Sequence, residues 1–294
     1  MVRNDNIIDG KGLSETIKKE IAEEVKVLVS HGERAPHLAA ILVGENPASQ
    51  SYVRSKVRSC EQVGFQSTLI QKEADITEVA LLEVVDQLNN DEAIDGFIVQ
   101  LPLPKHIDEM KVTMAIDPAK DVDGFHPVNV GKMSLGLDCF LPATPYGIVQ
   151  MLDRYNIETS GKHCVIVGRS NIVGTPMSIL MSRKAKVGNC TVTLTHSRTK
   201  DIKEELLRAD IIIAAIGYPN FVTADMIKRG AVVIDVGINR VDDPEAKRGY
   251  RLVGDVDFHG CKMKAGFITP VPGGVGPMTV TSLLMNTLKA RKFS

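Results

Sequence analysis

Segments typical of helices alternate with segments typical of buried strands along most of this sequence. In the first half, the spacing of apolar residues over 13–32 predicts an amphipathic helix, and the apolar run 37–44 predicts a buried strand. The same patterns predict further helices and strands over 45–64, 66–71, 77–89 and 94–104. Such alternation predicts an α/β fold with a mostly parallel sheet that helices cover on both faces.

A second alternating series follows a helical segment over 146–157. Its first strand, 162–168, enters the loop "RSNIVGTP", and a helix is expected from about Pro176. Three more strands are expected over 190–196, 209–217 and 230–237. This order is that of a Rossmann-like nucleotide-binding domain.

The length of 294 residues is large for one hydrophobic core, so two domains are expected. We place an N-terminal α/β domain at 1–146 and the Rossmann-like domain at 147–276. The last helix comes after the second sheet is complete, so we expect 277–294 to return to the first domain.

Composition excludes several classes of protein. A net charge of −1 gives no basic surface for nucleic acid or an anionic membrane. No apolar run approaches the ~20 residues that span a bilayer, and the N-terminus lacks the apolar core of a signal peptide. Five scattered cysteines form no CxxC pair, which argues against a disulfide framework or a zinc knuckle. We expect a cytoplasmic protein without nucleic-acid or membrane partners.

The loop after the first strand of the second series is a candidate phosphate-binding turn. Gly168 and Gly174 flank it, and Ser170 stands where the usual fingerprint has its second glycine. Small loop residues before a helix N-terminus can accept a pyrophosphate. The alternative is a tight turn that binds no ligand.

The following strand bears on the choice of nicotinamide cofactor. Sites for the unphosphorylated ribose usually carry Asp or Glu about 20 residues after the glycines. Here the sequence is "LTHSRT", with Ser197 and Arg198, and Arg169 lies in the glycine loop. Cations and hydroxyls without an acid favour a 2′-phosphate and therefore NADP, although Arg198 alone is equally compatible with a solvent-facing side chain.

Tyr52 and Lys56 lie four residues apart along the edge of an apolar stripe in the predicted helix 45–64. Arg54 and Arg58 fall on the opposite side. Partial burial would lower the pKa of Lys56 and suit it to acid–base chemistry near neutrality. The alternative is a lysine whose ammonium group reaches solvent beside a boundary tyrosine.

Polar residues follow the strand over 94–104. Gln100 is placed at its C-terminal end, where ligands gather in open α/β sheets. Asp121 and Asp123 lie in the next loop, where Asp121 is also compatible with a simple turn or cap. No histidine falls at a metal-ligand spacing, so no metal is expected. The glycine-rich stretch 270–279 lacks the Lys-Ser/Thr pair of a P-loop and is either a wall of a site or a rigid turn before the last helix.

Six motifs in one order resemble a single family: "YVRSK", "VQLPLP", "KDVDGFHPVNVG", "PATPYG", "VGRSNIVGTP" and "TPVPGGVGPMT". This pattern is similar to bifunctional methylenetetrahydrofolate dehydrogenase/methenyltetrahydrofolate cyclohydrolase, over essentially the whole chain. The resemblance implies NADP-dependent oxidation of 5,10-methylenetetrahydrofolate, then hydrolysis of the methenyl product to 10-formyltetrahydrofolate. It makes 1–146 the folate-binding domain and implies a homodimer.

The resemblance also implies roles for individual residues. Lys56 would be the key cyclohydrolase residue, Gln100 its partner, Tyr52 the residue that orients the folate, and Asp123 the anchor of the pterin ring. Further folate contacts would come from Leu101, Pro272, Gly273, Gly276 and Pro277, and cofactor contacts from Gly168, Arg169, Ser170, Ser197 and Ile238. The family commonly has Cys where this chain has Ala143, and the segment before Cys190 is a few residues longer than usual.

Two other functions share features of this sequence. Short-chain dehydrogenases also use Tyr-x-x-x-Lys, but their glycine loop precedes that pair, whereas here it follows by more than a hundred residues. A non-catalytic folate- or NADP-binding regulator would be expected to lose Lys56, Gln100 or Asp123, and all three are present.

Overall fold

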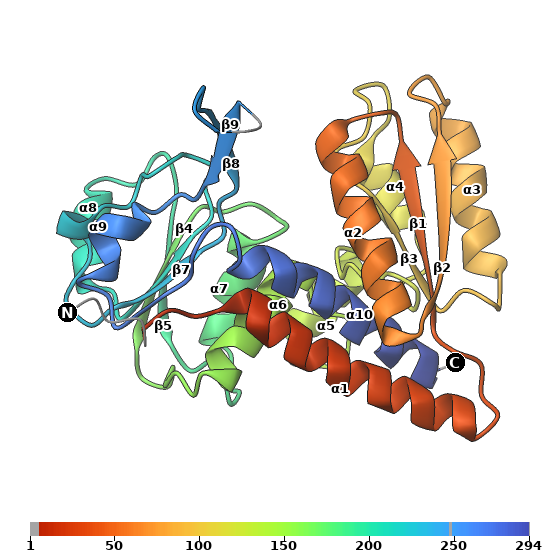
Figure 1. Cartoon of the computed structure of the whole chain (residues 1–294), viewed down its shortest axis with the longest axis horizontal. Helices are drawn as coiled ribbons and strands as arrows, with labels where there is room; N and C mark the ends of the chain where they lie inside the picture. Colours follow the sequence, from red (N-terminus) through yellow and green to blue (C-terminus); the bar gives the residue numbers. More distant parts are fainter. Residues whose placement is uncertain (1–5, 247–248, 294) are drawn as a thin grey trace. The chain divides into compact units, whose positions relative to one another are not determined.

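The computed structural model describes residues 6–246 and 249–293, which form two compact units (Figure 1). Glu15–Ala143 and the segment from Val280 form the three-stranded unit. Thr144–Thr279 and the segment up to Ser14 form the five-stranded unit. The first five residues and Ser294, which belong to the ranges expected for the first domain, lie outside the described residues.

The sheet of the three-stranded unit is parallel, as predicted. Its order is β2 (Gln66–Lys72), β1 (His37–Val43), β3 (Gly96–Val99). Successive side chains of a strand point to opposite faces. Ala39 and Ile41 pack against α3 (Glu78–Asn90) and α4 (Glu109–Ala115), while Leu38, Ala40 and Leu42 are buried on the other face. Both faces of this sheet are therefore covered.

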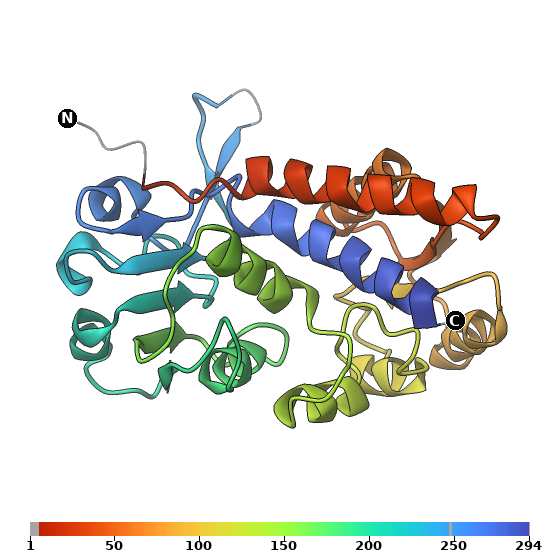
Figure 2. The same cartoon turned by 90° about the horizontal axis from the view of Figure 1, so that it is seen from below.

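Helices α1 (Gly10–Ser30), α2 (Pro47–Val63) and α5 (Pro127–Ser134) precede or follow these strands. The apolar stripe predicted for α1 is confirmed, because Ile17, Ile21 and Val25 are buried. The last helix, α10 (Val275–Phe293), lies beside α1 in both views (Figures 1 and 2), and Lys292 forms an ion pair with Glu24. The C-terminal helix thus completes the three-stranded unit.

The second sheet is also parallel. Its order is β10 (Phe267–Ile268), β7 (Val232–Asp235), β6 (Ile211–Ala214), β4 (His163–Val167), β5 (Thr191–Thr195). Its helices are α6 (Ala143–Arg154), α7 (Gly174–Ser182), α8 (Ile202–Arg208) and α9 (Phe258–Lys262), with a 3₁₀ turn at Ala224–Met226. Strand β4 leads directly through a short loop into α7, which is the strand–turn–helix arrangement expected for a nucleotide-binding domain.

Parts of the structure differ from the sequence expectations. An antiparallel hairpin of β8 (Asn239–Asp242) and β9 (Tyr250–Val253) was not predicted, because its strands carry no continuous apolar run. The last helix was predicted, and its start at Val275 places Gly276 and Pro277 in its first turn.

The N-terminal segment up to Ser14 groups with the five-stranded unit, whereas the expected division placed it with 1–146. The physical reason is a short parallel pairing at the sheet edge. Ile8 N donates to Ile268 O, and Ile268 N donates to Asn6 O, each at 2.9 Å. The Asn6 amide also donates to Lys262 O and Ala265 O.

Among the described residues, no helix has the length and apolar character needed to cross a membrane.

Candidate active site

Helix α2 places Lys56 inside the three-stranded unit. The helix starts next to Asn46, whose side-chain oxygen accepts a hydrogen bond from Ser49 N, as in an N-cap. Val53 and Cys60 share its buried face, and Lys56 lies between them with only 8% of its surface exposed. Tyr52 lies at the edge of this face and is 39% exposed. A fully solvated Lys56 is therefore excluded.

A hydrogen bond joins two of the predicted residues. Lys56 Nζ donates to Gln100 Oε1 over 3.1 Å. Gln100 directly follows β3, where its backbone N donates to Ile41 O, and its Nε2 donates to Leu101 O over 2.7 Å. Because the amide nitrogen is used in that bond, the amide oxygen faces the lysine.

Lys56 and Asp123 influence each other electrostatically. Burial lowers the pKa of Lys56, and the charge of Asp123 opposes that shift. Burial likewise raises the pKa of Asp123, and Lys56 opposes it. Each group therefore gives up its charge more readily than in water. A lysine whose pKa is lowered in this way exchanges protons more readily than a lysine in water.

Buried polar groups fix the loop that carries Asp123. Asp121 accepts hydrogen bonds from His126 N and from the Asn129 amide, at 2.7 and 2.9 Å, so the structure gives it the role of a turn and cap residue. The backbone oxygen of Asp123 accepts from Ala143 N at 3.3 Å. Ala143 is buried, at the position where the family commonly has Cys.

In the five-stranded unit, the turn after β4 carries three of the predicted cofactor residues, Gly168, Arg169 and Ser170. Gly168 has a φ of +115°, and a Cβ there would collide with Ala215 O. A Cβ on Gly174 would likewise collide with Gly168 O. The Ser170 hydroxyl accepts hydrogen bonds from Val173 N and Gly174 N at the start of α7. Only glycines permit this close approach of the helix to the turn.

The end of β5 lies beside this turn, since Gly168 N donates to Thr195 O at 3.0 Å. Ser197 and Arg198 follow and are exposed, as is Arg169. The ring nitrogen Nδ1 of His196 accepts from Arg198 N, which closes the turn. Ser197 and Arg198 on one segment and Arg169 on the other therefore supply a hydroxyl and two guanidinium groups at the exposed end of the sheet where a ribose 2′-phosphate is expected.

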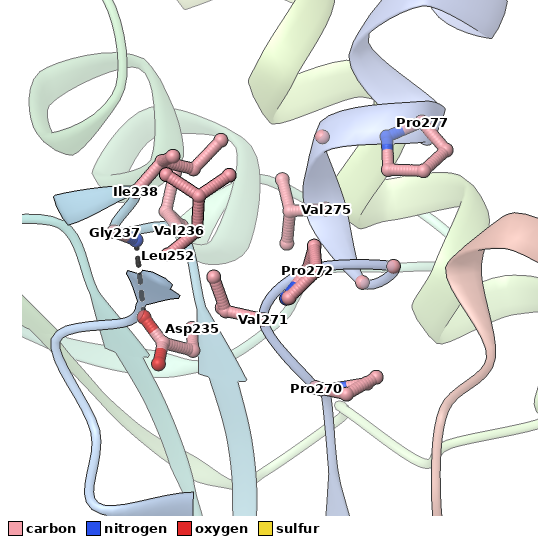
Figure 3. A pocket seen from close by; sticks show the side chains of 13 residues that line it. Asp235, Val236, Gly237, Ile238, Leu252, Pro270, Val271, Pro272, Val275 and Pro277 are labelled. Atoms are coloured by element: carbon pink, nitrogen blue, oxygen red, sulfur yellow. Dashed lines mark hydrogen bonds between the residues drawn. The ribbon is translucent and has the colours of Figure 1, made fainter. Parts of the chain in front are cut away.

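A pocket of about 160 Å³ lies at the C-terminal ends of β7 and β10 in the same unit (Figure 3). It brings together all five predicted residues of that region: Ile238, Pro272, Gly273, Gly276 and Pro277. Figure 3 shows Ile238, Val236 and Leu252 on one side of it and Val271, Pro272 and Val275 on the other. The lining is largely apolar, which suits one face of a flat ring.

Two family models match the chain. The catalytic-domain model of tetrahydrofolate dehydrogenase/cyclohydrolase covers residues 8–123, and the NAD(P)-binding-domain model of the same family covers residues 142–294. The chain belongs to the tetrahydrofolate dehydrogenase/cyclohydrolase family. The resemblance drawn from the six sequence motifs is thereby confirmed.

Individual relatives cover nearly the whole chain. The bifunctional protein FolD of Flavobacterium johnsoniae is 60% identical over 286 residues, which are 97% of both proteins. The crystal structure of the Campylobacter jejuni bifunctional enzyme FolD superposes with a TM-score of 0.92 at 46% identity and 98% coverage of both chains. A Trypanosoma brucei FolD structure, complexed with NADP cofactor and inhibitor, gives 0.92 at 40% identity and covers 98% of this chain and 97% of its own.

Several residues that line the pocket of this tetrahydrofolate dehydrogenase/cyclohydrolase were not predicted from the sequence. Asp235 ends β7, and Leu252 comes from the unpredicted hairpin. An acid that ends an apolar strand was a signal for Asp235, since strand ends meet at one edge of a parallel sheet. Nothing in the local sequence marked Leu252. Within residues 6–246 and 249–293, no three His, Cys, Asp or Glu side chains are grouped to hold a metal ion.

Proposed function

We propose that this enzyme oxidises 5,10-methylenetetrahydrofolate with NADP and hydrolyses the methenyl product to 10-formyltetrahydrofolate, with Lys56, Gln100 and Asp123 as the central polar residues. Both activities are those of the family to which the chain belongs. The observation that carries the residue assignment is the hydrogen bond between the buried Lys56 and the partly buried Gln100. A lysine held in one direction away from bulk water is a costly arrangement that simple stability does not require.

For the hydrolysis, we assign proton transfer to Lys56. The methenyl carbon is already cationic, so attack by water needs chiefly an acceptor for the proton that the water loses. The lowered pKa of Lys56 makes its neutral amine accessible for that purpose. Gln100 Oε1 accepts one N–H of Lys56 and fixes the direction of the amine. Ring opening of the adduct then gives the formyl product with net release of one proton.

We assign binding of the folate to the side chains near Lys56. Asp123 carries hydrogen-bond acceptors for the amino and ring N–H groups of a pterin, and the exposed ring of Tyr52 offers a flat surface to stack on it. Leu101 adds an apolar contact next to Gln100. We also propose that Pro272, Gly273, Gly276 and Pro277 contact the folate.

The residues of the five-stranded unit fit NADP. When bound, NADP supplies the hydride acceptor, so the protein contributes binding and orientation. The close packing of α7 on the turn between Gly168 and Gly174 requires that both positions lack a Cβ, and we assign the pyrophosphate to this turn. Arg169, Ser170 and Ser197 are assigned to the phosphates, and the exposed side chain of Ile238 to the nicotinamide ring.

We further propose a homodimer in the cytoplasm. The support is the sequence resemblance, together with five cysteines that are all free thiols in the described structure. Light scattering of the purified protein tests the assembly, because a dimer has twice the chain mass of 32.0 kDa.

The decisive experiment is a spectrophotometric assay with methylenetetrahydrofolate, run separately with NADP and NAD. We expect reduction of NADP without accumulation of the methenyl intermediate. Accumulation of methenyl product would contradict the role of Lys56 in a second step. Absence of reduction with either cofactor would instead favour a folate- or NADP-binding regulator.

A further inference from the structure

Two buried aspartates adjoin the pocket of the five-stranded unit: Asp235 lines it, and Asp255 contacts the lining residue Gly237. Asp235, at the end of β7, is 2% exposed, and Asp255, which follows the hairpin, is 0% exposed. Carboxylates removed from water need compensating hydrogen bonds. Those of Asp235 and Asp255 connect segments that are far apart in the sequence.

Asp255 holds the segment that follows β6. One of its oxygens, Oδ2, accepts from Ile216 N at 2.7 Å and from Gly217 N at 2.9 Å. The preceding Ala215 packs so closely on Gly168 that a Cβ at Gly168 would collide with its carbonyl oxygen. Asp255 therefore fixes the segment against which the proposed phosphate turn rests.

The same carboxylate holds the segment that follows β7. Its other oxygen, Oδ1, accepts from the Asn239 amide at 2.9 Å. A Cβ at Gly237 would collide with this oxygen, so Gly237 packs directly on it. Gly237 and Ile238 line the pocket (Figure 3). One carboxylate thus contacts the segment that supports the proposed phosphate turn and the segment that carries Ile238, which is assigned to the nicotinamide ring.

Asp235 in turn holds Asp255 in place. Asp235 Oδ1 accepts from Asp255 N at 2.9 Å and from Gly237 N at 3.0 Å, and its Oδ2 accepts from Val256 N at 3.0 Å. A Cβ at Gly254 would collide with the Asp235 carboxylate. Asp255 is thereby fixed through its backbone as well as through its side chain.

We propose that Asp255 is a positioning residue for hydride transfer, which sets the placement of the Ile216–Gly217 and Gly237–Asn239 segments around NADP. This inference rests on the proposed dehydrogenase function. It predicts that a change at Asp255 alters NADP binding and the oxidation step, while the hydrolysis assigned to Lys56 continues.

The test is Asp255→Asn. The side chain keeps its shape, but one carboxylate oxygen is replaced by an amide N–H₂ group, which cannot accept hydrogen bonds from the N–H donors around it. We expect the Kd for NADP to rise about tenfold, the equivalent of roughly one lost charged hydrogen bond. Dehydrogenase kcat should fall as well. Hydrolysis of supplied methenyltetrahydrofolate should stay within about twofold of wild type. A smaller folded fraction would lower kcat but leave Kd unchanged, so Kd separates positioning from simple destabilisation.

Asp257→Ala is the matched control, since Asp257 caps α9 through Gly260 N and does not line the pocket. It should lower thermal stability without changing the Kd for NADP. If Asp255→Asn does not fold, Asn239→Ala removes one of the three bonds, and a rise in Kd of about threefold is expected.

A Kd within twofold of wild type in a folded variant, or an equal rise in Asp257→Ala, overturns the inference. The wild-type assay separates this outcome from failure of the proposed function. Wild-type protein that reduces no NADP contradicts the function itself, whereas active wild type with an unaffected variant contradicts only the role of Asp255.

Discussion

A buried lysine amine that is hydrogen-bonded to an amide and influenced by a carboxyl is the residue-scale feature to which we assign the hydrolysis. Lys56→Ala removes the proton acceptor and leaves Gln100 without its partner. We expect cyclohydrolase activity to fall by at least ~10², while NADP binding, which uses the other unit, is retained. The measurement is hydrolysis of methenyltetrahydrofolate together with NADP affinity.

Arg58→Ala is the control on the same helix, because Arg58 is exposed on its opposite side. It should leave hydrolysis unchanged. Wild-type hydrolysis in Lys56→Ala would contradict the assignment.

Asp235 gives a pH dependence whose sign follows from its burial. Burial raises the pKa of Asp235 from 3.8 to about 7. The fold therefore favours the protonated acid, and the stability that this group contributes declines as pH rises from ~4 to ~7. Asn cannot ionise and loses no stability in this pH range. The Tm of Asp235→Asn minus the Tm of wild type should therefore be larger at pH 8 than at pH 5.

Asp225 supplies the control for this titration. Its hydrogen bond with Lys203 lowers its pKa to about 2, so it is ionised at both pH values in the folded and the unfolded chain. Asp225→Asn should therefore change Tm by the same amount at pH 5 and pH 8. The same flat response in Asp235→Asn would show that Asp235 does not titrate in this window.

At the scale of elements, two helical glycines should respond oppositely to the same substitution. Gly131 in α5 is exposed, and a Cβ there would meet open space, so Gly131→Ala should stabilise the protein by ~0.5–1 kcal/mol. A Cβ on Gly174 would collide with Gly168 O at the start of α7. Gly174→Ala should cost ~1–3 kcal/mol and weaken NADP binding.

Urea unfolding and NADP titration measure both effects. A tolerated Gly174→Ala with normal NADP affinity would be inconsistent with the tight turn proposed to hold the pyrophosphate.

Local sequence patterns predicted most of the helices and strands but not which of them pack or pair with each other. The buried strands β1, β4, β6 and β7 were found because they are apolar runs bounded by glycine or polar residues. The hairpin β8–β9 was missed because its strands are half exposed and rich in polar residues. Its position decides where Asp255 lies, so the network beside the pocket was not predicted either.

The same limit applies to the site. The stripe on α2 indicated that Lys56 lies at a buried edge, but Gln100 is 44 residues further along the chain. Only the pairing of β1 with β3 brings the two together, and single-sequence periodicity carries no information about such pairing. The assignment of Gln100 to Lys56 came from the family resemblance.

At the scale of the whole molecule, the three-stranded unit depends on the end of the chain. Asn286 on α10 is 2% exposed, and its amide donates to Val122 O at 2.8 Å and to Leu141 O at 2.9 Å. Asn286→Ala leaves both carbonyls without this donor and should cost about 1–3 kcal/mol. Val122 adjoins Asp123. On heating Asn286→Ala, hydrolysis should therefore be lost at a lower temperature than NADP binding.

The comparison variant is Asn90→Ala, whose amide donates an exposed hydrogen bond to Asp86 O on α3. Its stability should change by less than ~0.5 kcal/mol. Equal thermal inactivation of the two variants, measured by residual hydrolysis after heating, would show that the contact from α10 does not support the loop.

The return of α10 also determines the order in which the two units are completed during translation. Domains generally fold from the N-terminus as the chain leaves the ribosome. Here the segment from Val280 belongs to the same unit as Lys56 but follows residues 144–279 of the five-stranded unit in the sequence. A nascent chain can complete the parallel sheet of the three-stranded unit early, but the loop of Asp123 gains its hydrogen bond from Asn286 only after the five-stranded unit has been synthesised. The unit that begins to form first is therefore completed second.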